Sequence, residues 1–384
     1  MRLVLAEYQQ SDLYSDQDQS APDPLQTFIK YCNIAGIGGV LREGVIEATV
    51  PSQDKARLCG RLRLERLRKD FSKLPWAVAY QLEALLSNGL LHAGQVEELL
   101  PKVRQLCKKH LRNDSAFVGN LLRDYTRDLQ TRAMGPAPSL PTNPLKIFDD
   151  LLKSFDSTES ETPPGTFRCG HVTFTPTRML LHGPFPTQSN RIIRQYPAFC
   201  SHFLRVDFRD EDRLQYTWDR STDETLVLRE RIGGILKYGF VLCGRKFEFL
   251  AYSSSALREH SVWFISPFDY VMPSGVSVKV TAQFIRDGIG DFAGTDLMRC
   301  PSKYAARLAQ AFTATDPSVS IRRENWEMVE DLGKKPYLFT DGVGTISEGL
   351  AKDVWNALKD NGRGFGDIVP SAVGGSLLWT RFQN

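Results

Sequence analysis

The order of apolar and polar positions divides the chain into a helical first part and a second part of mixed helix and strand. The stretch "LPWAVAYQLEALLSN" at 74–88 is apolar almost all round, interrupted by Gln81 and Glu83, which predicts a buried helix. Two more helices are predicted at 93–110 and 117–132. Pro101 lies inside the first of these and is expected to break or kink it.

A stretch rich in Pro, Ser and small residues marks the expected domain boundary. Residues 133–144 and 156–165 have this composition, and a short helix is predicted between them at 145–155. We therefore expect a flexible acidic leader at 1–24, a helical domain at 25–132 and a linker at 133–165.

After Thr166 the pattern changes to the alternation that is typical of strands. Strand candidates lie in "FRCGHVTFTPTRMLLHG", "FLRVDFRDED", "GILKYGFVLCGRKFEFLAYSSS" and "SVWFISP". Helices are expected between them at 188–196, 281–287 and 302–311, the last with Tyr304, Leu308 and Phe312 packing inward. The predicted fold class is α+β, with a mixed α/β domain over 166–335.

Composition narrows the class of protein. The 384 residues are 42% apolar and 24% charged, which is ordinary for folded chains of two or three domains. No apolar run approaches the length of a bilayer span, and the N-terminus lacks the apolar region of a secretory signal. We therefore expect an intracellular protein, in nucleus or cytoplasm, that is not secreted and binds no membrane.

The seven cysteines are scattered without C-x-x-C pairs, which argues against a disulfide framework or a zinc module. The Cys169-Gly170-His171 cluster has no second pair of ligands. Net charge is only +3 but uneven, because residues 1–24 carry one base and five acids, whereas 55–73 carry eight bases and two acids. Such asymmetry fits either an anionic partner such as nucleic acid or a solvated basic helix.

Candidate chemistry begins with an acidic cluster, "VDFRDEDR" at 206–213. Its four carboxylates suit Mg²⁺, and alternation along a strand would place Asp210 and Asp212 on one face. The alternative, which we favour, is a solvated strand end or turn balanced by neighbouring arginines. Phosphate-loop, dinucleotide, G-x-S-x-G and His-Glu-x-x-His motifs are absent.

Basic and amide side chains gather in three later segments. Ser189 or Asn190 is expected to cap the helix that carries Arg191 and Arg194. These groups fit contacts to phosphate or structural ion pairs. The candidates for phosphate contact or for structural support are Arg178, Asn190, Arg191, Arg194, Arg258, Lys303 and Arg307.

Near the end, "YLFTDGVGTIS" at 337–347 on its own predicts a β-hairpin with an Asp-Gly turn. When this segment is taken in order with the earlier motifs, the whole series favours an interpretation other than a simple hairpin. The series is "VTFTPTRMLLHGPFPTQSNRIIRQYP", "FLRVDFRDED", "GGILKYGF", "RKFEFLAYSSSALREHSVWF", "IRDGIGDF", "CPSKYAARLAQAFT" and "YLFTDGVGTIS". It resembles the cellular RNA-dependent RNA polymerases of RNA silencing, most closely the fungal members, over roughly residues 172–347.

The resemblance implies that residues 336–384 begin the first of two double-psi β-barrels of a polymerase core, ending in an aberrant tail. Asp341, Gly342 and Gly344 would shape the barrel turn without catalysis. The family's catalytic Asp-x-Asp-Gly-Asp loop, which holds Mg²⁺ for two-metal nucleotidyl transfer, is absent from these residues. We interpret the chain as truncated before that loop, as a fragment or a truncated gene product.

The implied function is RNA-directed RNA synthesis on an RNA template from ribonucleoside triphosphates, producing double-stranded RNA for silencing, with silencing proteins as further partners. The alternatives are a noncatalytic RNA-binding remnant and an inactive gene product. Because a barrel closes only when all its strands pair, we expect the chain alone to be inactive and aggregation-prone around 337–384.

Overall fold

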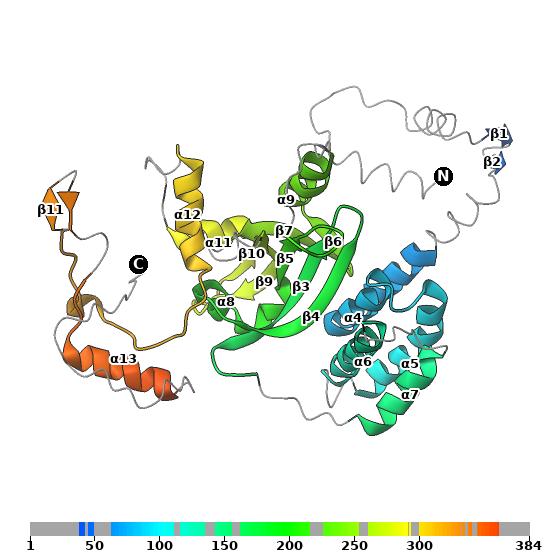
Figure 1. Ribbon diagram of the computed structural model, residues 1–384, viewed down its shortest axis with the longest axis horizontal. Helices are drawn as coiled ribbons and strands as arrows, with labels where there is room; N and C mark the ends of the chain where they lie inside the picture. Colours follow the sequence, from blue (N-terminus) through cyan, green and yellow to red (C-terminus); the bar gives the residue numbers. More distant parts are fainter. Residues whose placement is uncertain are drawn as a thin grey trace.

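The computed structural model describes residues 38–42, 45–49, 63–110, 116–134, 143–155, 162–215, 226–252, 260–290, 292, 299–330, 332–334, 337–339 and 344–360. Figure 1 shows the helices of the first part grouped beside the central sheet, with the last helix apart from both. The expected acidic leader, Arg258, Asp341, Gly342 and the tail after residue 360 lie outside the described residues. The helices of the described part include none with the length and apolar character of a bilayer span.

The helical part contains the elements that apolar spacing predicts. They are α4 (Trp76–Ser87), α5 (Ala93–His110), α6 (Phe117–Met134) and α7 (Pro144–Ser154), preceded by a helical stretch at 63–71. The break expected at Pro101 is wrong, since α5 continues through it. Leu99, Leu100 and Val103 are buried around the exposed proline, so packing of this face holds the helix together despite the missing N–H.

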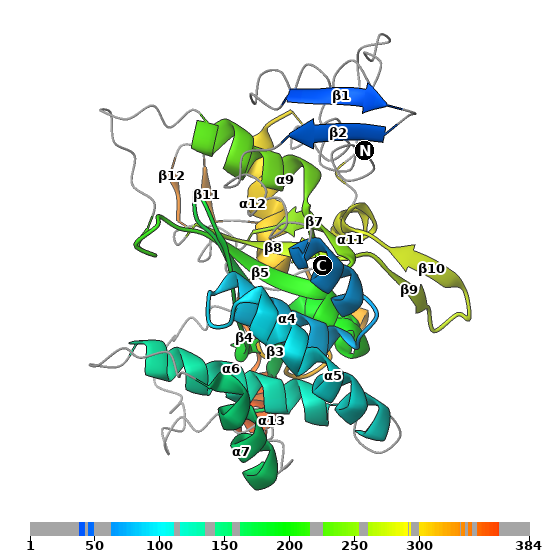
Figure 2. The same cartoon turned by 90° about the vertical axis from the view of Figure 1, so that its right-hand side faces the viewer.

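Helix α4 is apolar all round because it lies between two cores. Val78, Leu82 and Leu85 pack with the helices α5–α7, whereas Tyr80 and Ala84 pack with the sheet. Figure 2 shows α4 between the sheet and the remaining helices. Its buried Glu83 accepts hydrogen bonds from Arg68 at 2.9–3.4 Å, so the charge that interrupts the pattern is paired.

The sheet has the strand order β4-β3-β5-β8-β7-β6. Only the β3–β5 pair is parallel. The strands are β3 (Thr166–Phe174), β4 (Met179–Gln188), β5 (Phe203–Phe208), β6 (Phe240–Leu242), β7 (Arg245–Ala251) and β8 (Ser261–Ile265). The strand expected from "GILKYGF" begins instead as a helix, α9 (Gly234–Tyr238), and becomes β6 after Gly239, whose φ of 76° favours glycine.

Both faces of the sheet are covered. Tyr80 and Ala84 of α4 and Ile235 of α9 pack on one face. The other face packs against α8 (Arg191–Gln195), α11 (Ala282–Ile289), α12 (Pro301–Ala311) and the hairpin of β9 (Phe268–Val271) and β10 (Ser277–Val280). The predicted helices at 188–196, 281–287 and 302–311 are thus confirmed, and β9 and β10 are further strands. Figure 2 shows this hairpin projecting beyond α11.

Shorter elements complete the described chain. They are β1 (Gly38–Arg42), β2 (Val45–Thr49), η1 (Pro197–His202), η2 (Leu226–Gly233), η3 (Arg323–Asn325), β11 (Gly333–Lys334), β12 (Tyr337–Leu338) and α13 (Glu348–Asp360). Strand β12 pairs with β11, upstream of the Asp-Gly-Val-Gly turn. Tyr337 is 78% and Phe339 86% exposed, and Gly344 is exposed as well.

Candidate nucleic-acid interface

The helix α8 begins as the sequence predicts, with Asn190 as its cap. The amide of Asn190 is 1% exposed, and its Oδ1 accepts a hydrogen bond from the Ile193 backbone N–H at 3.0 Å. Its buried Nδ2 has no hydrogen-bond partner among the residues that the structure describes. The cap therefore orients α8, but the amide itself is not on the surface.

The guanidinium of Arg194 connects α8 to the segment after α12. It donates to the Thr315 carbonyl and, at 2.9 Å, to the Thr315 hydroxyl. The backbones of the two segments also meet, because Thr315 N–H donates to the Ser189 carbonyl at 3.1 Å. Burial lowers the pKa of Arg194. This arginine therefore has a structural role, whereas Arg191, next to the cap, is half-buried.

Arg178 stands at the opposite end of β4. Ten residues of strand separate it from Asn190, roughly 30 Å of extended chain. Its exposed guanidinium lies 3.5 Å from Glu211. The same carboxylate accepts hydrogen bonds at 2.7 Å from the backbone N–H and the hydroxyl of Thr177, which lower the pKa of Glu211.

The acidic cluster does not continue β5. The strand ends at Phe208, and Asp210 and Leu214 face each other across a turn, with the Asp210 N–H donating to the Leu214 carbonyl at 3.1 Å. The expectation that Asp210 and Asp212 share a strand face is therefore wrong, and the turn that we favoured is present. The described residues contain no group of three or more His, Cys, Asp or Glu that could hold a metal ion.

The last two described candidates lie on α12. Lys303 and Arg307 are exposed one turn apart, while Leu308 and Phe312 are buried, as the pattern predicts. Tyr304 is only half-buried, in edge contact with Phe292. The candidates are thus distributed over the α8–α12 region and the distant turn at Arg178.

Sequence reasoning missed a row of polar side chains that crosses the sheet. Arg205 pairs with His171 of β3, which in turn pairs with His182 of β4. Arg205 Nε donates to the Ser261 hydroxyl at 2.6 Å and lies 3.8 Å from Asp207. Burial lowers the pKa of His171 to about 4, and the nearby Asp207 opposes that shift.

Two atoms of this row, His171 Nε2 and Asp207 Oδ1, are buried and lack a hydrogen-bond partner in the described part of the chain. The sequence contains one usable signal, since positions 205 and 207 alternate with the apolar positions 204, 206 and 208. The parallel register that brings His171 beside Arg205 is not visible in the sequence.

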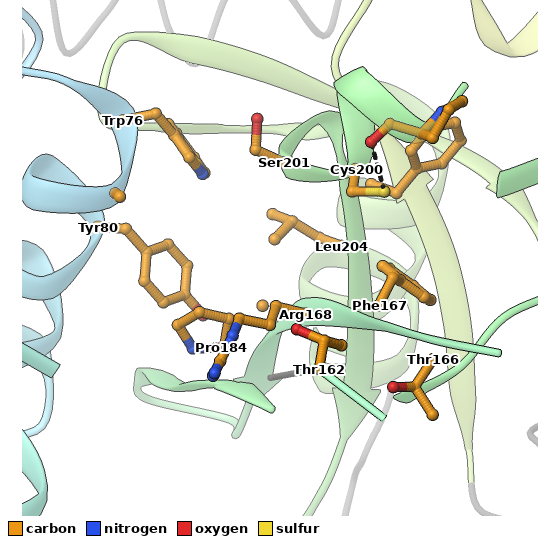
Figure 3. A pocket seen from close by; sticks show the side chains of 14 residues that line it. Trp76, Tyr80, Thr162, Thr166, Phe167, Arg168, Pro184, Cys200, Ser201 and Leu204 are labelled. Carbon is orange, nitrogen blue, oxygen red and sulfur yellow. Dashed lines mark hydrogen bonds between the residues drawn. The ribbon is translucent and has the colours of Figure 1, made fainter. Parts of the chain in front are cut away.

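The structure also contains a cavity of about 510 Å³ between α4 and the sheet. Figure 3 shows Trp76 and Tyr80 on one side of it, Leu204 and Cys200 on the other, and Arg168 at its floor. Tyr80 is fixed because its hydroxyl lies 2.9 Å from the carbonyl oxygens of both His171 and His182. The sequence offers no signal for this cavity, because its walls come from elements far apart in the chain.

Comparisons with known proteins identify the family. The model of the family described as RNA dependent RNA polymerase matches residues 174–375, about half of the chain. RNA-dependent RNA polymerase 1 of Arabidopsis thaliana is 38% identical over 304 residues, which is 73% of this chain and 25% of that protein. RNA-dependent RNA polymerase 1 of Schizosaccharomyces pombe is 27% identical, over 77% of this chain and 21% of that protein.

Among solved structures, the RNA dependent RNA polymerase QDE-1 from Thielavia terrestris aligns with a TM-score of 0.43 and 14% identity, covering 75% of this chain and 30% of that one. On the strength of the family match, the chain belongs to the RNA-dependent RNA polymerase family. The chain spans about a quarter of the length of the curated relatives it matches.

Proposed function

We propose that this chain is part of an RNA-directed RNA polymerase, which copies an RNA template from ribonucleoside triphosphates and supplies double-stranded RNA for gene silencing. The observation that carries the proposal is the family match over residues 174–375. The matched region includes five strands of the sheet, β4 to β8, and the helices α8, α11 and α12, so the match falls on a packed core rather than on one short motif.

Within that enzyme we assign these residues a scaffolding and RNA-contacting role. Residues from 336 onward would enter a double-psi β-barrel, with Asp341, Gly342 and Gly344 shaping its turn. Arg191, Lys303 and Arg307 are the best-placed RNA contacts, since the latter two are exposed on one helix face and Arg191 lies beside the α8 cap. Arg178 and Arg258 stay in the proposed set, with Asn190 and Arg194 acting through the position of α8.

Magnesium chemistry is not assigned to the described residues. They offer no cluster of three ligating side chains, and the 384 residues contain no Asp-x-Asp-Gly-Asp sequence. In the complete enzyme, Mg²⁺ would be held by carboxylates outside these residues. The 384-residue polypeptide on its own is therefore proposed to be inactive, and the exposed Tyr337 and Phe339 support its tendency to aggregate.

A template-directed incorporation assay tests the proposal. The purified 384-residue chain is expected to incorporate no labelled nucleotide on single-stranded RNA with Mg²⁺. A longer protein, extended by the downstream reading frame that supplies an Asp-x-Asp-Gly-Asp loop, is expected to be active and to lose activity when one loop aspartate becomes alanine. Activity of the 384-residue chain, or an inactive longer protein that is well folded, would contradict the proposal.

The second candidate is a noncatalytic RNA-binding protein, which would use the exposed Lys303 and Arg307 on one face of α12. Salt-sensitive binding of single-stranded RNA without any incorporation by the longer protein would support it. Both candidates place the protein inside the cell, in the nucleus or cytoplasm.

A further inference from the structure

The cavity beside α4 has the size and walls of a small-ligand site. Its volume of about 510 Å³ lies within the range of roughly 300–1,000 Å³ that is typical of such sites. The aromatic side chains of Trp76 and Tyr80 from α4 form one wall, and Leu204 of β5 lies opposite them. Such walls favour a flat, apolar group.

The aromatic wall is held in place by its neighbours. Arg245 lies over the Trp76 ring at 4.5 Å, and the ring of Phe247 is 5.5 Å away. Gly170 keeps the floor open, because a Cβ there would come within 2.8 Å of Leu204 and 3.2 Å of the Tyr80 ring. The cavity is therefore pre-formed by packed residues and does not need to be opened by a ligand.

The cavity has one charged side chain in its described lining. This is Arg168, and the described lining residues include no carboxylate. A second arginine is near, since burial and then the charge of Arg168 lower the pKa of Arg123. Thr162, Thr166 and Ser201 add hydroxyl-bearing side chains to the lining.

We propose that this cavity binds one nucleoside phosphate unit of RNA, with the base against the Trp76 and Tyr80 wall and the phosphate at Arg168. Stacking on aromatic rings is insensitive to base identity, and a guanidinium fits a phosphate bidentately. The choice of RNA rests on the proposed function, whereas the choice of an aromatic ring with an anionic group rests on the cavity itself. The site is distinct from the candidates on α8 and α12.

Two substitutions test the space for the base and the phosphate contact of the site separately. Ser201 is exposed and projects into the cavity in Figure 3, so Ser201→Phe fills the space for the base while Ser201→Ala leaves it open. Arg168→Gln removes the phosphate contact, and its matched control is Arg132→Gln, which changes an exposed arginine of α6. Anisotropy of a short 5′-fluorescein oligouridylate on the 384-residue chain is expected to show about ten-fold weaker binding for Ser201→Phe and Arg168→Gln. Both controls should match the unchanged chain.

A chemical readout that does not depend on variants is available at Cys200. This half-buried thiol lines the cavity and donates to the Pro197 carbonyl at 3.1 Å. Its alkylation by N-ethylmaleimide, followed by peptide mass spectrometry, should slow at least three-fold when uridine monophosphate or the oligonucleotide is bound. Cys300, at the start of α12, is the internal reference for the mononucleotide and should react at an unchanged rate with that probe.

The outcomes distinguish this inference from the proposed function. Protection of Cys200 by the free mononucleotide identifies a nucleotide site, and protection by the oligonucleotide alone identifies a strand site; either supports the inference. Unchanged Cys200 reactivity with both probes overturns it. RNA binding that is weakened by Arg191→Gln but not by Ser201→Phe also overturns it while leaving the proposed function intact. Protection of Cys200 by the mononucleotide without any RNA binding would support the nucleotide site and contradict the RNA-contacting role proposed for these residues.

Discussion

The side-chain amide of Asn88 hydrogen-bonds to the backbone of the outer strand of the sheet, and its removal should lower the free energy of unfolding. Strand β4 is an edge strand, and Asn88, directly after α4, donates through Nδ2 to the Leu181 carbonyl at 2.7 Å and accepts from the Leu181 N–H at 2.9 Å. The side chain thus satisfies both outward backbone groups of one strand residue. Leu181 is completely buried, so water cannot replace the amide.

The magnitude follows from those two bonds. Asn88→Ala leaves one buried N–H and one buried C=O without a partner, at about 1–3 kcal/mol each. Because some relaxation is expected, we predict a loss of about 2–4 kcal/mol in the free energy of unfolding. Asn88→Asp should be at least as destabilising, since it keeps an acceptor for the N–H but places a negative charge beside the Leu181 carbonyl oxygen.

Urea unfolding followed by circular dichroism measures the loss, and hydrogen exchange of the β4 peptide locates it. Gln283→Ala is the matched control, because that exposed amide donates to Asp287 of the same helix and should change stability by less than about 0.5 kcal/mol. A change below that value for Asn88→Ala, with unaltered exchange at Leu181, would refute the reasoning.

Three further predictions concern single positions. Gly239→Ala should cost more than about 3 kcal/mol in urea unfolding, since its Cβ would lie 2.0 Å from the Phe247 carbonyl oxygen at a φ of 76°; a stable variant would contradict that geometry. Burial lowers the pKa of His171 to about 4, so the folded state favours its neutral form. The contribution of His171 to the free energy of unfolding is therefore complete above pH 6.5, and it falls by up to roughly 3 kcal/mol as the pH drops to 4. His171→Asn should remove that part of the slope in unfolding experiments at several pH values, and an unchanged slope would exclude this residue as its source. Arg194→Met should speed hydrogen exchange around Thr315 and lower stability by about 1–2 kcal/mol, whereas unchanged exchange would mean that the two bonds contribute nothing.

Local patterning predicted most elements of the fold, because their causes are local. The all-round apolar stretch of α4, the cap at Asn190 and the buried stripe of α12 are properties of neighbouring residues, and each is present. The errors arose where tertiary context overrides propensity. Pro101 is tolerated because the buried residues beside it hold α5 together. The segment "GILKY" forms α9, and the strand expected there starts only after Gly239.

The candidate site was predicted less well than the fold. Charge and amide content indicated Arg191, Lys303 and Arg307, of which the last two are exposed and Arg191 is half-buried beside the α8 cap. Spacing could not distinguish them from Arg194, whose partner Thr315 lies 121 residues away. The cavity and the polar row depend on strand register and on the docking of α4, and neither is encoded within a short window of sequence.

The double-sided packing of α4 also constrains how this protein can change. One set of its residues fits a helical bundle and another set fits a β-sheet, so a shift of the helix that accommodates a substitution on one side disturbs the packing on the other. The helical part and the sheet are therefore poor candidates for exchange between relatives as separate modules. Compensating changes should instead arise in pairs that cross the α4 interface.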